Sequence, residues 1–372
     1  MGLLEGSVVL TLSNLIVRIG GYIYRILMGR MLAPYEFGLL SLALPLQYMV
    51  VILTSSGIAP SIAKFVSEHE ARKEHEKKDS MISSSLFFYT LLGIFFGAAF
   101  YILADPIGIY IFHDLNAITP LKISSAALPF GVLVAVYTGV FQGLKKFGYM
   151  SATLAIEQVL RIIFALVLVY YSLSAVNAIL GSTLGFAAAA LLAYLLFKKL
   201  RQRLSSPSFT NFKEIFYFSI PISATALSAF VLAYIDIILL GFYLTPKEVG
   251  IYSAASPTSR LVLAFSSALY ATLLPSISEL KAKKDYKEIK AYIKYAYTLS
   301  LLVLLPATLL SIYFSELIIT LLFGEGYSGA ARPFEILVVG TAFLGIFTLN
   351  SGIFQGLGKP KIPMRILLFA AV

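Results

Sequence analysis

The chain has 372 residues, of which 59% are hydrophobic and 13% are charged, and its mean hydropathy is +0.86. A soluble domain carries about 25% charged residues, so this composition excludes an ordinary water-soluble globular protein. Cysteine is absent, which excludes disulfides, thiol catalysis and cysteine metal sites. The net charge of +10 alone would suggest a nucleic-acid partner, but its placement along the chain indicates a different role.

Apolar stretches long enough to cross a hydrocarbon core of about 30 Å recur along the whole chain. The first stretch has no basic segment before it and no obvious cleavage site, so we interpret it as a retained span and not as a signal peptide. The fold class is therefore an all-α polytopic membrane protein. Ten complete spans are predicted, and an eleventh begins at Met364: 8–28, 38–62, 81–104, 121–142, 150–171, 174–197, 215–242, 249–275, 293–315 and 333–354.

Every second predicted loop is rich in lysine and arginine, whereas the opposite loops are nearly free of them. Basic loops face the cytoplasm, so we expect a multi-pass protein of the cell (cytoplasmic) membrane with a cytoplasmic N-terminus. The positive charge is thus a topology signal, and we expect no nucleic-acid partner. The basic loops are 64–79, 145–146, 198–213, 281–294 and 359–365, and the opposite loops hold Arg30, Lys122, Lys247 and Arg332.

The chain repeats itself at a spacing of about 212 residues. Residues 26–45 align with residues 238–257, and ten of the twenty positions are identical. A second match, at a spacing of 213, aligns the six residues that start at Gly139 with the six that start at Gly352. The repeat unit holds six spans, so both halves insert in the same orientation, related by an axis along the membrane normal.

The repeat predicts two homologous six-helix bundles around a central cavity, with the second bundle incomplete. We place an N-terminal lobe at 1–200, a cytoplasmic linker at 201–213 and a C-terminal lobe, with four spans and a truncated fifth, at 214–372. Two units of six need twelve spans, so we expect the sequence to lack the end of its second bundle.

Six charged side chains lie at least three residues inside the ends of the predicted spans. A centrally placed arginine costs about 2.5–3.5 kcal/mol on insertion scales, so each needs a partner or a function. Four positive against two negative groups would leave a buried chamber cationic, and guanidinium groups suit phosphate in particular. The six are Arg18, Arg25, Glu157, Arg161, Asp236 and Arg260.

The simpler alternative is that these groups only pair with one another and brace the bundles. Glu157 and Arg161 are four residues apart and can pair on one helix face, and Arg25 could extend to the outer interface. The two halves share glycines and prolines but not charges, as expected for a site added to a common scaffold. In the repeat, Phe230, Ile237 and Tyr48 take the places of Arg18, Arg25 and Arg260.

Small-residue spacing occurs three times and predicts close helix packing. Recurring prolines, such as Pro45 and its repeat partner Pro257, predict bends in the spans. The charged stretch 64–79 is typical of a solvated helix, and the spacing of His69 and His75 does not suit zinc. The glycine pairs are Gly139 with Gly143, Gly181 with Gly185, and Gly352 with Gly356.

Motifs of enzymes are missing from the sequence, including a phosphate-binding glycine loop, a nucleophile elbow and a paired-histidine helix. The longest predicted outer loops, 105–119 and 315–332, are short for a catalytic domain. We therefore expect a transporter and not an enzyme, with no cofactor and no metal.

Three segments carry a resemblance to a known family: residues 20–40, residues 55–64, and residues 141–144 with their repeat. The first two are similar to the opening, and the third to the ends of the fourth and tenth spans, of the polysaccharide-biosynthesis flippases, which belong to the multidrug/oligosaccharidyl-lipid/polysaccharide (MOP) exporter superfamily. The resemblance covers nearly the whole chain. It implies two six-span lobes around a cavity that opens alternately to each side, and a polyprenyl (di)phosphate carrying sugars as the substrate.

The same resemblance assigns roles to the charges. It implies that Arg18, Arg25 and Arg260 hold the diphosphate, and the charge pattern adds Arg161. Asp236 resembles a coupling site for H⁺ or Na⁺, and Glu157 is interpreted as a second coupling group or as charge balance.

The leading hypothesis is a monomeric flippase, surrounded by membrane lipids, that moves a lipid-linked oligosaccharide from the cytoplasmic to the outer leaflet. A cation-coupled multidrug extruder is the first alternative, although its cavity should be acidic or aromatic. A membrane glycan polymerase or ligase is the second.

Overall fold

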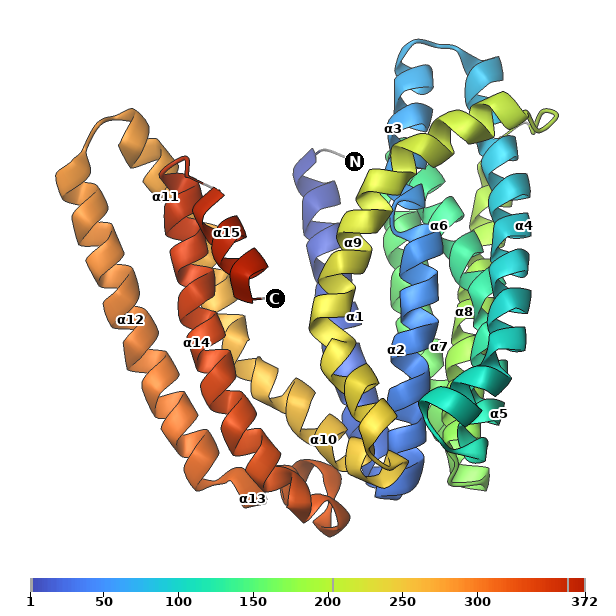
Figure 1. Cartoon of the computed structure of the whole chain (residues 1–372). Helices are drawn as coiled ribbons and strands as arrows, with labels where there is room; N and C mark the ends of the chain where they lie inside the picture. The colour runs from blue at the N-terminus through green and yellow to red at the C-terminus, as the bar shows by residue number, and fades with distance from the viewer. Residues whose placement is uncertain (1–2, 203, 360, 371–372) are drawn as a thin grey trace. The chain divides into compact units, whose positions relative to one another are not determined.

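The computed structural model describes residues 3–202, 204–359 and 361–370, and no described residue lies in a β-strand (Figure 1). The main helices are α1 (Leu3–Met31), α2 (Pro34–Ser55), α3 (Ile58–Ala71), α4 (His75–Pro106), α5 (Ile118–Ser125), α6 (Ala127–Gly143), α7 (Phe147–Tyr171), α8 (Ala175–Lys199), α9 (Phe209–Tyr243), α10 (Pro246–Ser259), α11 (Leu263–Ala282), α12 (Tyr286–Tyr313), α13 (Ser315–Phe323), α14 (Ala331–Gly356) and α15 (Lys361–Ala370).

The helices confirm the all-α polytopic fold class. Within the described residues, seven helical stretches are long and apolar enough to cross a membrane, and the bent helix α9 would be an eighth. Helices occupy all ten of the predicted span ranges. Several predicted spans are interrupted by short breaks. Within the range 249–275 a short 3-10 turn (η3, Arg260–Val262) separates α10 from α11, and within the range 38–62 two residues separate α2 from α3.

The charged stretch 64–79 differs from the single solvated helix that its pattern predicted. Helix α3 continues beyond the apolar span to Ala71, and α4 begins at His75 after a turn in which Lys73 has a φ of 59°. The turn is stabilised by Glu74, whose backbone N–H donates to the His69 carbonyl at 2.9 Å. The stretch is thus the polar tip of a helical hairpin.

By packing, the chain divides into two compact units, Met1–Gly250 and Ile251–Val372. In the first unit, α7 packs along α8, and α6 packs on α3, α4 and α8 (Figure 1). The predicted lobes are divided at 201–213 on the basis of the internal repeat, whereas the packing units are divided after Gly250. The two divisions therefore describe different properties of the chain.

The first unit extends to Gly250 because the linker and α9 pack on the N-terminal bundle. The backbone N–H of Ser205 donates to Ser83 Oγ at 3.0 Å, and that of Ser208 donates to Ser84 Oγ at 2.8 Å. Further along, Ile215 of α9 is fully buried in the same core as α3, α4 and α6. The linker is therefore held along α4.

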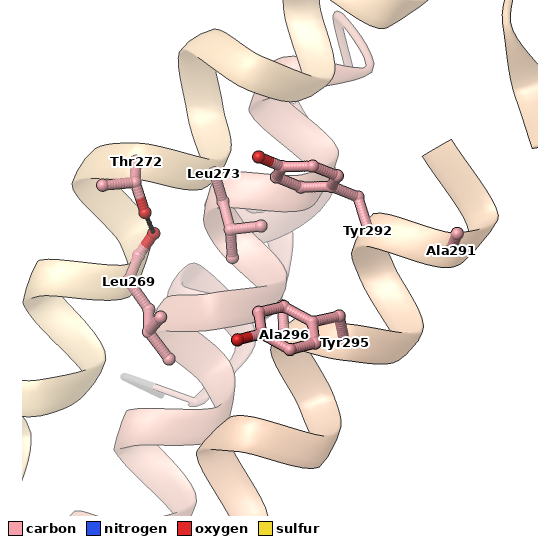
Figure 2. Close-up of a pocket in the computed structure, with 7 residues that line it drawn as sticks. All are labelled: Leu269, Thr272, Leu273, Ala291, Tyr292, Tyr295 and Ala296. Carbon is pink, nitrogen blue, oxygen red and sulfur yellow. Dashed lines mark hydrogen bonds between the residues drawn. The ribbon is translucent and has the colours of Figure 1, made fainter. Parts of the chain in front are cut away.

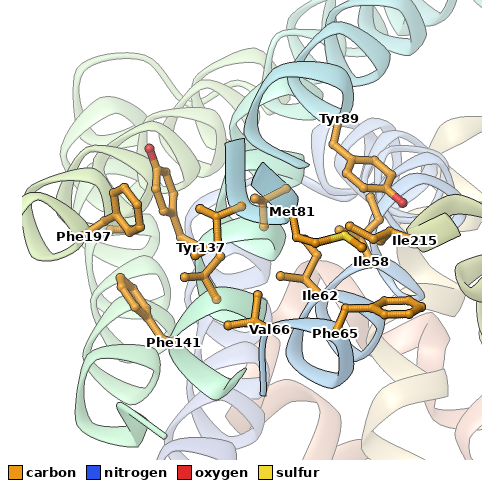
Figure 3. Packing of buried hydrophobic residues seen from close by; sticks show 14 of the residues in the cluster. Ile58, Ile62, Phe65, Val66, Met81, Tyr89, Tyr137, Phe141, Phe197 and Ile215 are labelled. Carbon is orange, nitrogen blue, oxygen red and sulfur yellow. The ribbon is translucent and has the colours of Figure 1, made fainter. Parts of the chain in front are cut away.

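That core is a cluster of aliphatic and aromatic side chains (Figure 3). Ile62 and Val66 of α3 are fully buried against Val140 and Phe141 of α6. The Tyr137 ring continues the cluster toward α8. Burial of a side chain of this size contributes about 1.5–3 kcal/mol relative to exposure in water, and less in a membrane, so shape matters more here than area.

Glycines allow the helices of both units to approach closely, which confirms the packing predicted for the three spaced pairs. A Cβ on either glycine of a pair would come closer than 3.0 Å to an atom of the neighbouring helix. The neighbours are α3 for Gly139 and Gly143, α7 for Gly181 and Gly185, and α11 for Gly352 and Gly356.

The second unit is built on α11, α12 and α14. Leu273 of α11, Ala296 of α12 and Leu349 of α14 share one buried cluster. The Tyr270 hydroxyl donates to Gln355 Oε1 at 2.8 Å, so the amide oxygen at the end of α14 is engaged by α11.

Candidate functional site

Arg161, midway along α7, is the most buried of the four candidate arginines, with 8% of its surface exposed. Its guanidinium carbon lies 5.3 Å from the centroid of the Tyr24 ring and 5.9 Å from that of Tyr48. The guanidinium also donates hydrogen bonds to the Tyr48 hydroxyl and to Gln158 Oε1. A desolvated cation over an aromatic face gains about 2 kcal/mol. Side chains from α1, α2 and α7 therefore all contact this guanidinium group.

Glu157 completes the cluster, at 3.9 Å between its Oε1 and Arg161 Nη1, which confirms that the two side chains pair. The two side chains are 13% and 9% exposed. The distance is at the long end of ion-pair geometry, and Arg161 is held more closely by Tyr48 and Gln158. Glu157 thus balances the buried charge without being its main partner.

Small residues on neighbouring helices make room for this polar cluster. A Cβ on Gly185 of α8 would lie 2.8 Å from the Arg161 Cα, and a Cβ on Gly20 of α1 would lie 2.6 Å from the Gln158 Cγ. The Tyr24 hydroxyl donates to the Ala178 carbonyl of α8 at 3.1 Å. The cluster is consequently enclosed by α1, α2, α7 and α8.

Two donors in the cluster remain unused in the described part of the chain. Arg161 Nε and Gln158 Nε2 are both buried without a hydrogen-bond partner. A buried polar group left unpaired costs about 1–3 kcal/mol. Both N–H groups are donors, and their acceptor would be an oxygen atom, such as that of a phosphate.

Arg18 and Arg25 lie two helical turns apart on α1, and so on one face. Arg18 is exposed, whereas Arg25 is half-buried. The Arg25 guanidinium lies 6.0 Å from the centroid of the Tyr234 ring in α9, and that ring stacks on Phe230 at 4.5 Å. An aromatic pair in α9 therefore faces the cationic side of its repeat partner α1.

Asp236 and Arg260 have separate surroundings. Asp236 is half-buried in α9, and its Oδ1 accepts the backbone N–H of Ile237 at 2.9 Å. Arg260 belongs to the second unit, where its Nη2 lies 3.4 Å from Ser256 Oγ at the 3-10 turn. The structure thus brings Glu157 and Arg161 together in the first unit and places Arg260 in the second.

Tyr24, Tyr48 and Gln158 were missed by the sequence analysis. Gln158 lies three residues before Arg161, which puts it on the same helix face and could have drawn attention to it. The two tyrosines carry no such signal, because they are 137 and 113 residues from Arg161 and meet it only through packing.

Comparison with known proteins defines the family. The model of the polysaccharide biosynthesis protein family matches residues 3–281, and the MatE model matches residues 221–372. An uncharacterized membrane protein of Methanocaldococcus jannaschii is 28% identical, over 100% of this chain and 89% of the relative. The lipid II flippase MurJ of Bacillus subtilis is 24% identical, over 100% of this chain and 75% of its own.

A solved structure supports the same fold. The inward-facing conformation of a multidrug resistance MATE family transporter of the MOP superfamily aligns with a TM-score of 0.72 and 17% identity, covering 93% of this chain and 83% of that one. Since the first family model covers well over half of the residues, the chain belongs to the polysaccharide biosynthesis protein family.

Proposed function

We propose that this protein flips a polyprenyl-(di)phosphate-linked oligosaccharide from the cytoplasmic to the outer leaflet of the cell membrane, for synthesis of a surface glycan. The observation that carries the proposal is the excess of arginine over acidic side chains within the spans of a chain from this family. The N-terminus and the basic loops face the cytoplasm in this proposal.

In the proposed mechanism, the exposed Arg18 and the half-buried Arg25 of α1 bind the diphosphate together with Arg260. The sugars occupy a hydrophilic cavity, and the prenyl chain stays in the lipid. Arg161 has aromatic and polar partners already, so it stabilises the bundle and adds positive potential. Asp236, with Glu157 as a second group, couples the cycle to H⁺ or Na⁺.

The test is flipping of a short-chain polyprenyl-diphosphate sugar by the purified protein, as a monomer in proteoliposomes. Arg18→Ala, Arg25→Ala and Arg260→Ala should each lower the rate at least tenfold while leaving the melting temperature within a few degrees. Lys247→Ala, at an exposed position in the first turn of α10, is the matched control and should flip at the wild-type rate. Wild-type rates in all three arginine variants would overturn the proposal.

A multidrug extruder is the second candidate, because the MatE model matches residues 221–372. An organic cation would need an aromatic or acidic site, yet the space between the rings of Tyr24 and Tyr48 is taken by Arg161. Efflux of an organic cation that is driven by an ion gradient and abolished in Asp236→Asn would favour this candidate over the flippase.

A further inference from the structure

A groove of about 330 Å³ lies between α11 and α12 in the second unit. Figure 2 shows Tyr292 and Tyr295 extending from α12 toward Leu269, Thr272 and Leu273 of α11. Leu273 is 3% exposed and forms the floor, whereas Tyr295 is 67% exposed and lies at the mouth. The remaining lining residues are Ala291 and Ala296. The walls are therefore apolar, with tyrosine hydroxyls near the opening.

The groove lies where α12 enters the predicted membrane region. Its lining residues on α12 fall between 291 and 296, close to the helix start at Tyr286, and overlap the end of the predicted basic loop 281–294. Tyrosine is enriched at the interface between lipid and water, where its ring lies in lipid and its hydroxyl reaches the headgroups. This end of the groove is thus at headgroup depth.

A stripe of three lysines on α12 lies next to the edge of the groove that Ala291 forms, and on the opposite side of the helix from Tyr292 and Ala296. With 3.6 residues per turn, Lys287, Lys290 and Lys294 lie within a sector of about 60° on α12, beside the face that carries Ala291 and Tyr295. All three are exposed, and they form no ion pair with the described residues. Glu288 is the acidic residue on this part of the helix, so the border remains positive.

We propose that this groove and the lysine stripe bind an anionic glycerophospholipid of the cytoplasmic leaflet. An acyl chain lies against Leu269 and Leu273, and the phosphate lies among Lys287, Lys290 and Lys294. Basic pockets between membrane helices on the cytoplasmic side bind anionic headgroups in this way. The inference rests on the proposed orientation of the basic loops but not on the proposed substrate.

A glycerophospholipid matches these features better than the prenyl-linked substrate does. The groove opens beside an exposed tyrosine, so bulk lipid can enter it directly. Three exposed lysines attract an anionic headgroup, whereas a zwitterionic headgroup carries no net charge, so the site should prefer the anionic lipid several-fold.

The absence of tryptophan from the sequence allows a direct test. In Tyr295→Trp, this chain carries a single tryptophan, at the groove mouth. Phosphatidylglycerol with brominated acyl chains, present as a minor component of phosphatidylcholine vesicles, should quench its fluorescence several-fold more than brominated phosphatidylcholine at the same fraction. Replacing Lys287, Lys290 and Lys294 by Gln in this background should make the two lipids equal.

The control is Phe87→Trp on α4, which is 50% exposed and lies at a comparable distance from the start of its helix. Its fluorescence should be quenched equally by both lipids. Equal quenching of Tyr295→Trp by both lipids, or a preference that survives the lysine replacements, would overturn the proposal. Displacement of the brominated lipid by a stoichiometric prenyl phosphate, but not by excess phosphatidylglycerol, would instead assign the groove to the substrate. The readout is independent of flipping, so it can fail while the proposed function stands.

Discussion

Gly38 and Gly250 are equivalent positions in the internal repeat, and each lies against the proline that precedes the other by four residues. A Cβ on Gly38 would come 1.6 Å from the Pro246 carbonyl oxygen, and a Cβ on Gly250 would come 1.9 Å from the Pro34 carbonyl oxygen. Pro34 and Pro246 are repeat partners as well. Such a reciprocal contact is expected where the pseudo-twofold axis passes between equivalent segments. Without a side chain at both glycines, the two main chains can touch.

Alanine at either glycine should destabilise the protein. The obstructing atoms are backbone carbonyl oxygens, which cannot move aside as a flexible side chain can, so Gly38→Ala and Gly250→Ala should each cost about 1–3 kcal/mol. Thermal unfolding of the purified protein in detergent measures the effect. Gly148→Ala on α7 is the control, since no heavy atom lies within 4 Å of its added Cβ. An unchanged midpoint for Gly38→Ala would show that the two segments separate readily.

The buried cluster around Arg161 should contribute mainly to stability. Arg161→Ala leaves Glu157 buried without its charge partner, and removing one member of such a pair costs about 3–5 kcal/mol. Arg18→Ala removes an exposed side chain and should change stability by no more than about 0.5 kcal/mol.

A double-mutant cycle, measured by thermal unfolding in detergent, separates the interaction between Arg161 and Glu157 from the other contributions of each side chain to stability. The combined variant Arg161→Ala with Glu157→Ala should be more stable than the sum of the single changes predicts, because no charge is then left unpaired. Strict additivity would mean that the two side chains do not interact energetically.

The contact between the linker and α4 should be measurable by hydrogen exchange. Ser83 and Ser84 accept the backbone N–H groups of Ser205 and Ser208, so replacing both by alanine removes two hydrogen bonds of about 1 kcal/mol each. We expect exchange at residues 204–211 to become about fivefold faster or more. Ser85→Ala should leave the linker unchanged, because that hydroxyl donates to the Met81 carbonyl of its own helix.

Acid should loosen the turn between α3 and α4. The hydrogen bond from the His69 ring, with help from Lys77, lowers the pKa of the Glu74 carboxyl below its ordinary value. A lowered pKa in the folded state stabilises the turn above the ordinary carboxyl pKa of about 4.3, and this contribution disappears as the pH falls through the lowered value. Hydrogen exchange at residues 72–78, corrected for intrinsic rates, should show an acid-dependent step in the wild type. A step of the same size in Glu74→Gln would refute this assignment.

Much of the fold follows from local and periodic features of the sequence. Apolar length predicts each span because every backbone polar group in lipid must be bonded within its own helix. Spacing alone also identified the close approach at Gly181 and Gly185, since small residues four apart leave a continuous groove along one helix face. The 3-10 turn at Arg260 was not predicted, because it interrupts an apolar stretch without a change in composition.

The helical membrane fold, the internal repeat, the alternation of basic loops and the identity of the intramembrane charges all follow from the order of residues along the chain. Which of those charges have close partners depends instead on how the helices pack. Arg161 meets Tyr24 and Tyr48 because glycines on α1 and α8 let those helices close on α7. The same structure leaves Arg18 exposed, although both arginines cost the same to place in lipid. The difference comes from contacts between residues more than a hundred positions apart, and no local pattern records them.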